Sequence, residues 1–346
     1  MKLQEKSFWN NIKSEQFLPV YLVTGTEDYL KQKYIKLLTD RAVPEGLRGF
    51  NYHRLDGDTM TMEQLVNAAE ALPAMSPRTC VLVHDLDFAA LKEADKEALL
   101  NLLEDPSDTC VLIFWQDTKG FPRNTKIMKS LYKAIDKAGA VVELNKRDRR
   151  DLVKFIRSEC RKRDRVISTQ AAEYLIESVG EDMTKLTSEI EKLCNYADQE
   201  ITRKDIDDIC IKTLEATAFQ MIDALMAENY DRVFRSIAIL FEQRTEPMMI
   251  LGALVSTYSD MYRVKVTVKS GGTPYDLKKL FPQAYKSEFK LKNASRRSKK
   301  FSLQALRQSL EILADADTKL KSTSEDTRTV FEKLMIELGL ARKRTA

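Results

Sequence analysis

The segment from Leu18 to Leu30 joins a short apolar run, a glycine turn and the start of a helical pattern, which is how phosphate-binding P-loops are built. A working P-loop has the pattern G-x-x-x-x-G-K-[ST], because backbone N–H groups surround the phosphates and a hydroxyl group holds magnesium. The residues at the defined positions of this pattern are Gly25, Leu30, Lys31 and Gln32. The second glycine and the hydroxyl group are missing. The sequence therefore predicts a degenerate P-loop without nucleotide chemistry.

Other residues that could do chemistry are few. The two histidines, His53 and His84, each lie beside a predicted strand and are interpreted as structural. Asp85 and Asp87 follow a predicted strand, where a nucleotide hydrolase keeps magnesium-binding acids, but without a phosphate loop we expect a solvated turn. The five cysteines have no C-x-x-C spacing, which argues against a zinc site or a disulfide framework. We predict no catalytic residue, no metal site and no cofactor.

Two stretches are rich in basic residues, although the net charge of +4 does not by itself indicate a nucleic-acid partner. Residues 145–165 contain ten Lys or Arg against four Asp or Glu, and residues 285–300 contain seven against one. Such stretches can neutralise phosphates along a nucleic-acid backbone, and Arg157, Arg161 and Arg163 are the candidate contacts. A charged helix face in water is the other interpretation, and the sequence leaves both open.

The segment Leu72-Pro73-Ala74-Met75-Ser76-Pro77 combines two prolines with small and apolar residues. The prolines stiffen the chain, so the segment could present Ala74 and Met75 to a partner, and methionine suits an adaptable contact surface. A buried connection between a helix and a strand is the alternative interpretation.

Residues 1–145 alternate between apolar runs and helical patterns, which predicts a parallel sheet covered by helices on both faces. The predicted strands are Pro19–Val23, Asn51–Leu55, Thr79–Val83, Cys110–Trp115 and Ala140–Leu144. Residues 61–71, 89–103 and 125–138 show helical patterns, the first with a capping box formed by Thr61 and Gln64. The expected fold of this part is α/β.

Beyond residue 145 the strand signals fade and helical patterns dominate. Residues 146–212 are predicted to form a small helical domain, and residues 213–346 a helical bundle interrupted by a loop at residues 270–274. The N-terminal residues lack the apolar core of a signal peptide, and no run of about 18 apolar residues is present. We therefore expect a soluble, cytoplasmic protein of two or three domains.

Collinear segments along the chain resemble the delta subunit family of the bacterial DNA polymerase III clamp loader. In the first part these segments are PVYLVTGTEDYL, FNYHRLDG, ALPAMSPRTCVLV and LLEDPSDTCVLIFW. The resemblance continues through DMTKLTSEIEKLCNYADQEITRKDI and EPMMILGALVSTYSDMYRVK, so it covers nearly the whole chain.

This resemblance implies an AAA+-like protein of three domains: an α/β core (1–145), a small helical lid (146–212) and a helical collar (213–346). Delta subunits of this kind neither bind nor hydrolyse ATP, although their holoenzyme is a DNA-directed DNA polymerase, a transferase. The implied partners are the sliding clamp (beta subunit), the delta prime and tau/gamma subunits through the C-terminal domain, and primed DNA. The implied location is the replisome at the bacterial nucleoid, with no membrane contact.

The family also implies which residues contact the clamp. Two hydrophobic residues after the fourth helix of the first domain fill a pocket on the sliding clamp, and the ring then opens for DNA to enter. Those positions correspond to Ala74 and Met75 in this chain. Ala74 is smaller than the residue usual in the family, and Leu72 and Pro73 are the candidates to compensate for it.

Three other functions remain open at this point. An active nucleotide hydrolase of the same fold would use Lys31 and Asp85. A stand-alone DNA-binding protein would use the two basic stretches. A pure assembly role within the complex would need no contact with the clamp.

Overall fold

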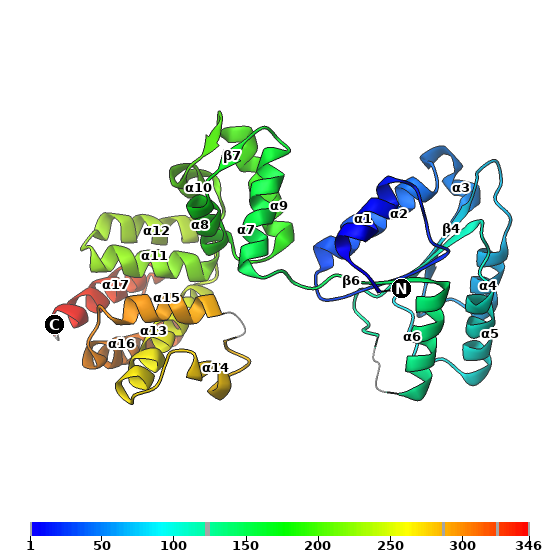
Figure 1. Ribbon diagram of the computed structural model, residues 1–346. Helices are drawn as coiled ribbons and strands as arrows, with labels where there is room; N and C mark the ends of the chain where they lie inside the picture. The colour runs from blue at the N-terminus through cyan, green and yellow to red at the C-terminus, as the bar shows by residue number, and fades with distance from the viewer. Residues whose placement is uncertain (1, 122–124, 286–287, 323–324, 345–346) are drawn as a thin grey trace. The chain divides into compact units, whose positions relative to one another are not determined.

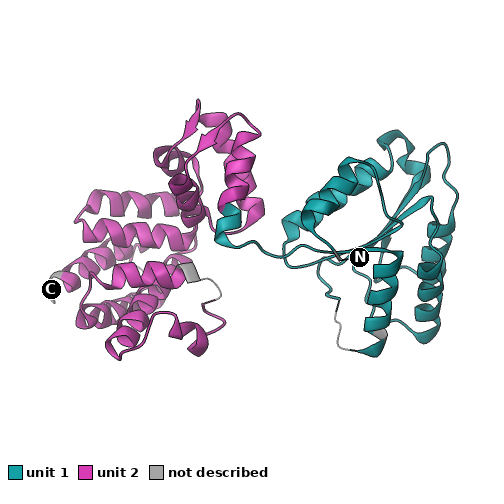
Figure 2. Ribbon diagram, in the orientation of Figure 1, with its two compact units in different colours: residues 1–152 teal, residues 153–346 magenta. Residues whose placement is uncertain are grey.

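The computed structural model describes residues 2–121, 125–285, 288–322 and 325–344. The chain divides into two compact units, residues 1–152 and 153–346 (Figures 1 and 2). Unit 1 is an α/β domain and unit 2 is mainly helical, which confirms the predicted fold class. Within the described residues, no helix is both long and apolar enough to cross a membrane.

Unit 1 is built on a six-stranded parallel sheet with the order β1-β6-β2-β5-β4-β3. Its strands are β1 (Lys2–Leu3), β2 (Val20–Thr24), β3 (Tyr52–Asp56), β4 (Thr79–His84), β5 (Cys110–Trp115) and β6 (Gly139–Glu143). The five predicted strands are confirmed to within one residue at each end, because buried parallel strands are continuous apolar runs. The two-residue β1 was not predicted, since it is too short to form a pattern.

Helices cover both faces of this sheet, as predicted (Figure 1). They are α1 (Glu5–Lys13), α2 (Asp28–Ala42), the 3-10 turn η1 (Glu45–Leu47), α3 (Arg48–Asn51), α4 (Met62–Glu70), α5 (Glu93–Glu104) and α6 (Lys126–Ala138). Val20 and Leu22 of β2 belong to the core shared with α4, α5 and α6. Tyr21, between them in the strand, instead packs against Phe8 of α1, as the alternation of a strand requires.

Side-chain hydrogen bonds determine where two of these helices, α4 and α5, begin. The predicted capping box at the start of α4 is present, because Gln64 N–H donates to Thr61 Oγ1 and Thr61 N–H donates to Gln64 Oε1. Helix α5 begins four residues later than predicted. The Asp87 carboxylate accepts hydrogen bonds from the N–H groups of Ala89 and Ala90, which holds those residues in a turn.

Unit 2 begins with four helices and a short parallel strand pair. These are α7 (Arg149–Arg161, which starts within unit 1), β7 (Val166–Ile167), α8 (Thr169–Val179), α9 (Met183–Tyr196), β8 (Glu200–Ile201) and α10 (Arg203–Ile209). Gly180 ends α8 with a φ of +97°, a backbone conformation that glycine adopts readily at the end of a helix. The strand pair was missed because two residues per strand carry no periodicity.

The rest of unit 2 is a helical bundle. It contains α11 (Leu214–Met226), α12 (Tyr230–Glu242), α13 (Pro247–Lys269), α14 (Asp276–Leu280), α15 (Glu288–Ser298), α16 (Leu303–Ser322) and α17 (Thr327–Arg344). One apolar core joins residues from all seven, including Ile222, Leu254 and Phe331. The predicted loop at residues 270–274 separates α13 from α14. A boundary at residue 212 between lid and collar domains stays a prediction.

Candidate functional site

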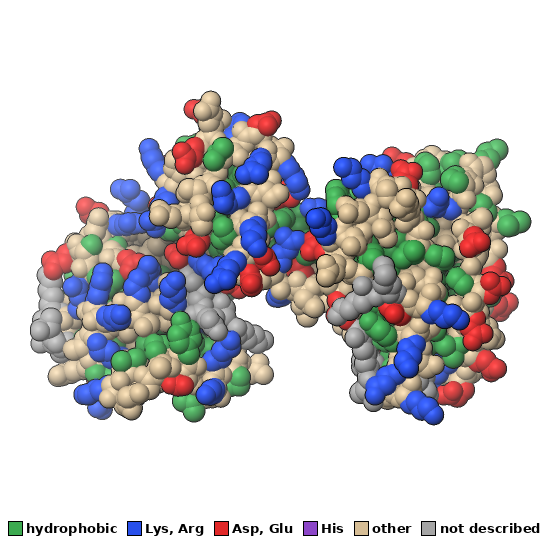
Figure 3. Space-filling model, viewed as in Figure 1, with side chains coloured by type: hydrophobic (Ala, Val, Ile, Leu, Met, Phe, Trp, Pro, Cys, Tyr) green, Lys and Arg blue, Asp and Glu red, His purple; other side chains and the backbone are tan. Residues whose placement is uncertain are grey.

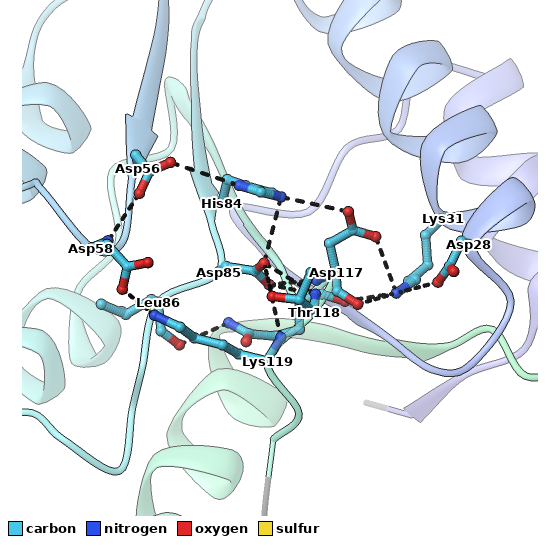
Figure 4. Close-up of polar contacts among 11 residues, drawn as sticks. Asp28, Lys31, Asp56, Asp58, His84, Asp85, Leu86, Asp117, Thr118 and Lys119 are labelled. Carbon is cyan, nitrogen blue, oxygen red and sulfur yellow. Dashed lines mark hydrogen bonds and ion pairs between the residues drawn. The ribbon is translucent and has the colours of Figure 1, made fainter.

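The carboxyl ends of β2, β4 and β5 meet at one edge of the sheet, which is where open parallel α/β sheets bind their ligands. We call this the carboxyl edge. Lys31, one of the residues of the predicted degenerate P-loop, lies beside it, together with His84, Asp85 and the segment after β5 (Figure 4). The Lys31 ammonium and the Asp85 carboxylate both bond to the segment after β5.

Lys31 is directed into the protein. Its side chain is only 1% exposed, and its ammonium donates hydrogen bonds to the backbone oxygens of Gln116 at 3.1 Å and Asp117 at 2.9 Å. The same ammonium lies 3.0 Å from a carboxylate oxygen of Asp28. A P-loop lysine must reach the phosphates of a nucleotide, whereas this one joins α2 to the segment after β5.

The other P-loop positions also have structural roles. Gly25 has a φ of +127°, and a Cβ at this position would lie 2.1 Å from the backbone oxygen of Leu144. The glycine is therefore required by the close approach of two backbone segments. Leu30 is buried in the core, and Gln32 is exposed on the outer face of α2.

Asp85 was expected in a solvated turn, and that prediction is wrong because its side chain is buried. The carboxylate accepts hydrogen bonds from the N–H groups of Asp117 at 2.6 Å, Thr118 at 3.0 Å and Lys119 at 3.2 Å, and from the Thr118 hydroxyl at 2.7 Å. Burial alone would raise the pKa of Asp85, but these hydrogen bonds, those of Thr118 first, lower it below its ordinary value. Asp87 does lie in an exposed turn.

His84 lies between the acidic side chains of the carboxyl edge. Its Nε2 is 3.7 Å from carboxylate oxygens of both Asp85 and Asp117, and its ring lies 4.5 Å from that of Trp115. Lys119 forms an ion pair with Asp58 across the same edge. These contacts match the structural role predicted for His84.

The second candidate site is the segment between α4 and β4, residues 71–78, which we call the tip segment. Leu72 is 87% exposed and Met75 is 91% exposed, so the alternative of a buried connection is wrong. Asn51, at the end of α3, holds the segment: Ala74 N–H donates to Asn51 Oδ1 at 2.7 Å, and Asn51 Nδ2 donates to the Ala74 oxygen at 2.8 Å. Pro73 is half-buried.

Of the three candidate DNA contacts, Arg163 has a structural role. Its guanidinium donates hydrogen bonds to the backbone oxygen and the carboxylate of Glu159, at 2.9 and 3.1 Å. The Glu159 hydrogen bonds raise the pKa of Arg163. Arg157 and Arg161 are exposed, and they lie four residues apart on one face of α7.

The second basic stretch, residues 285–300, also contains both cations that are paired with acidic residues and cations that are exposed. Arg297 is buried and paired with Asp223 at 2.7 Å, and Lys290 lies 3.1 Å from Asp260. Exposed positions on and after α15 carry the remaining charge, namely Lys292, Arg296, Lys299 and Lys300. Lys286 of this stretch lies outside the described residues.

Two important contributors to these sites carry no signal in the sequence. Asn51 was placed at the start of a predicted strand, whereas its fully buried side chain joins α3 to the tip segment. The N–H groups after β5 that hold Asp85 belong to the backbone, so no residue type signals them. No local pattern in the sequence identifies either contact, because each joins segments that are distant along the chain.

We expect Lys31→Met to destabilise unit 1 rather than to change nucleotide binding. The backbone oxygens of Gln116, which is buried, and Asp117, which is partly buried, would lose their donor, which should lower the free energy of unfolding by about 2–3 kcal/mol. Urea denaturation followed by tryptophan fluorescence measures this, since both tryptophans, Trp9 and Trp115, lie in unit 1. The matched control, Lys36→Met on the exposed face of α2, should change stability by less than about 0.5 kcal/mol. Unchanged stability of Lys31→Met would contradict the structural role.

We expect Asp85→Asn to weaken unit 1 at pH 7 by about 1–3 kcal/mol, because an amide cannot accept all the hydrogen bonds that the carboxylate accepts. Since its pKa is lowered in the folded state, the wild-type carboxylate contributes stability above an unfolded pKa of about 3.9. That contribution is lost as the pH falls through the folded pKa. The variant should therefore lose less stability than wild type on acidification below about pH 4.

The same fluorescence-monitored urea series, repeated from pH 7 to pH 2.5, measures this difference. Asp108→Asn, at an exposed position before β5, serves as the control and should follow the wild-type curve. Parallel curves for Asp85→Asn and wild type would contradict the proposed role of the carboxylate.

Comparisons with known proteins agree with this architecture. A family model described as DNA polymerase III, delta subunit, matches residues 21–145, and one described as the C-terminal domain of that subunit matches residues 215–338. The DNA polymerase III subunit delta of Bacillus subtilis is 24% identical over 338 residues, with 95% of each chain covered. A probable subunit delta of Aquifex aeolicus is 23% identical over 276 residues, covering 77% of this chain and 75% of the relative.

Among solved structures, the Bacillus subtilis DNA clamp loader delta protein (YqeN) has the same fold. The TM-score is 0.63 at 22% sequence identity, and the match covers 96% of this chain and 98% of that one. The two family models account for the sheet of unit 1 and for the bundle of unit 2, in the expected order. The chain therefore belongs to the DNA polymerase III delta subunit family.

Proposed function

We propose that this chain binds the sliding clamp through the tip segment and opens the clamp ring, so that the clamp can be loaded onto primed DNA during replication. Membership in the delta subunit family makes the chain a component of the DNA polymerase III holoenzyme, in its clamp-loader complex. The observation that carries the proposal is the tip segment, which exposes Leu72 and Met75 on a backbone fixed by Asn51.

The tip segment has the properties of a preorganised binding element. Among the described residues, Leu72 and Met75 are the two most exposed large hydrophobic side chains. Met75 has a φ of +54°, a conformation that costs energy in a non-glycine residue and is concentrated at functional sites. A segment already fixed in its bound conformation loses little entropy on binding, so more of the contact energy remains for affinity.

Opening a ring requires that the chain bind the open form more tightly than the closed form. Reversing a 1:99 equilibrium to 99:1 takes a difference of about 5.5 kcal/mol between the two affinities. Burying a side chain the size of leucine or methionine contributes about 1.5–3 kcal/mol. Two such side chains are therefore of the right order, provided that their pocket is fully formed only in the opened clamp.

The work of this chain would then be mechanical, with no reaction of its own. The carboxyl edge is occupied by the contacts of Lys31, Asp85 and His84, which favours a subunit that neither binds nor hydrolyses ATP. Energy for the loading cycle would come from ATP on neighbouring subunits. The helical bundle of unit 2 would join the delta prime and tau/gamma subunits as a collar, and the complex would act in the cytoplasm, at the nucleoid.

Arg157 and Arg161 are the proposed contacts with the backbone of primed DNA. Both are exposed, and neither has an ion-pair partner among the described residues. Two cations one helical turn apart suit neighbouring phosphates, whereas Arg163 is held by Glu159 and drops out of the proposed set.

The first test is binding of the full chain to its own sliding clamp, with Met75→Asp as the variant. A carboxylate would have to lose its hydration in an apolar pocket, so the affinity should fall by about 100-fold, or about 3 kcal/mol. Met249→Asp, at another exposed methionine on α13, is the matched control and should bind as wild type does. Equal binding of Met75→Asp and wild type would move the site elsewhere, and an absence of wild-type binding would refute the proposal.

The second test reverses both charges on α7, in the variant Arg157→Glu/Arg161→Glu. Because phosphate contacts release counterions, the variant should load clamps onto primed DNA more slowly and with a weaker dependence on salt concentration. Its binding to the clamp without DNA should equal that of wild type. Unchanged loading across the salt series would remove these residues from the DNA contact.

A further inference from the structure

One strongly exposed apolar residue of unit 1 lies outside the tip segment, next in the chain to Asn51. Phe50, in α3, is 71% exposed. Unit 1 has four exposed large hydrophobic residues in its described part, and the fourth, Trp9, is only 40% exposed and contacts Tyr34. Phe50, Leu72 and Met75 are therefore the large hydrophobic residues that are mostly exposed in the described part of unit 1.

These three side chains are carried by two segments that Asn51 joins. Asn51 follows Phe50 directly, and it is fully buried. Its amide donates hydrogen bonds to the oxygens of Leu47, at 3.0 Å, and Ala74, at 2.8 Å, and its oxygen accepts one from Ala74 N–H. The backbone next to Phe50 is thus fixed relative to the backbone between Leu72 and Met75. Figure 3 shows hydrophobic side chains standing out at the corner of unit 1 where α3 and the tip segment lie.

We propose that Phe50 is a third apolar anchor on the sliding clamp, beside Leu72 and Met75. This inference rests on the proposed function, and the occupant is the same clamp surface because Asn51 makes α3 and the tip segment one rigid element. Aromatic side chains are enriched among the residues that dominate interface energies, because they bury a large area with few rotatable bonds.

Phe50 also supplies what Ala74 lacks. The side chain of Ala74 is a single methyl group, and both its backbone polar groups are bonded to Asn51. An aromatic side chain can bury about 150–250 Å² on binding. Ala74 therefore positions the segment, while Phe50 provides the apolar area that a larger residue at position 74 would provide.

The one charged residue in the helix of Phe50 already has partners. Arg48, in the same short helix, forms an ion pair with Asp40 and stacks on the ring of Tyr52 at 5.6 Å. Burial of Phe50 against an apolar surface would therefore not require Arg48 to lose its hydration as an unpaired charge.

The test is an equilibrium titration of the full chain with its own sliding clamp, comparing wild type, Phe50→Ala and Met75→Asp. Phe50→Ala should weaken binding by about tenfold or more, the loss expected for an aromatic anchor. Tyr196→Ala, at an exposed aromatic residue of unit 2, is the matched control and should bind as wild type does. Because Phe50 is exposed, the urea denaturation curve of Phe50→Ala should coincide with that of wild type.

The outcomes separate this inference from the proposed function. If Met75→Asp loses binding and Phe50→Ala binds as wild type does, the clamp contact stands and the role of Phe50 is overturned. If wild type does not bind the clamp, both fail. Sedimentation velocity tests the other occupant: a wild-type dimer that becomes monomeric in Phe50→Ala, with clamp binding unchanged, would assign Phe50 to contact between copies of this chain and would overturn the proposal.

Discussion

The buried ammonium of Lys31 determines what the carboxyl edge of the sheet can do. Its hydrogen bonds to the backbone after β5 fix the start of α2, and the Asp85 carboxylate binds the next N–H groups of the same segment. A buried ammonium and a buried carboxylate are stable only with such partners. The positions that serve nucleotide chemistry in P-loop proteins therefore stabilise this domain instead. The strongly exposed hydrophobic side chains of its described part, Phe50, Leu72 and Met75, lie in α3 and the tip segment.

The tip segment depends on an uncharged side chain in an equivalent way. A single buried asparagine satisfies both backbone groups of Ala74 and an oxygen of its own helix, so α3 and the tip segment share one hydrogen-bond network. The tip segment therefore has a fixed backbone and exposed side chains, Leu72 and Met75. Such a segment can insert into a partner without a change in its own conformation.

The charges of unit 2 show why composition is a weak guide to binding. Both basic stretches have a large local excess of Lys and Arg, yet Arg163 and Arg297 are paired with acidic residues inside the unit. The remaining exposed cations are fewer and fall on particular helix faces, such as that of Arg157 and Arg161. A count along the chain cannot make this distinction, because pairing depends on which helices pack together.

The sequence by itself determined five strands of the unit 1 sheet, the mainly helical character of the rest of the chain, the capping box of α4 and the family. These depend on local periodicity, on side chains that are near one another in the chain and on collinear segments. It also predicted that the P-loop is degenerate, since a missing glycine and a missing hydroxyl group are local facts. Only the tertiary structure decided that Lys31 and Asp85 are buried and hydrogen-bonded to the segment after β5. It also decided that Asn51 fixes the tip segment and that Phe50, next to Asn51 in the chain, is exposed. The hydrogen bonds that Lys31, Asp85 and Asn51 make to other segments join residues between 23 and 86 positions apart, and such contacts leave no periodic signal.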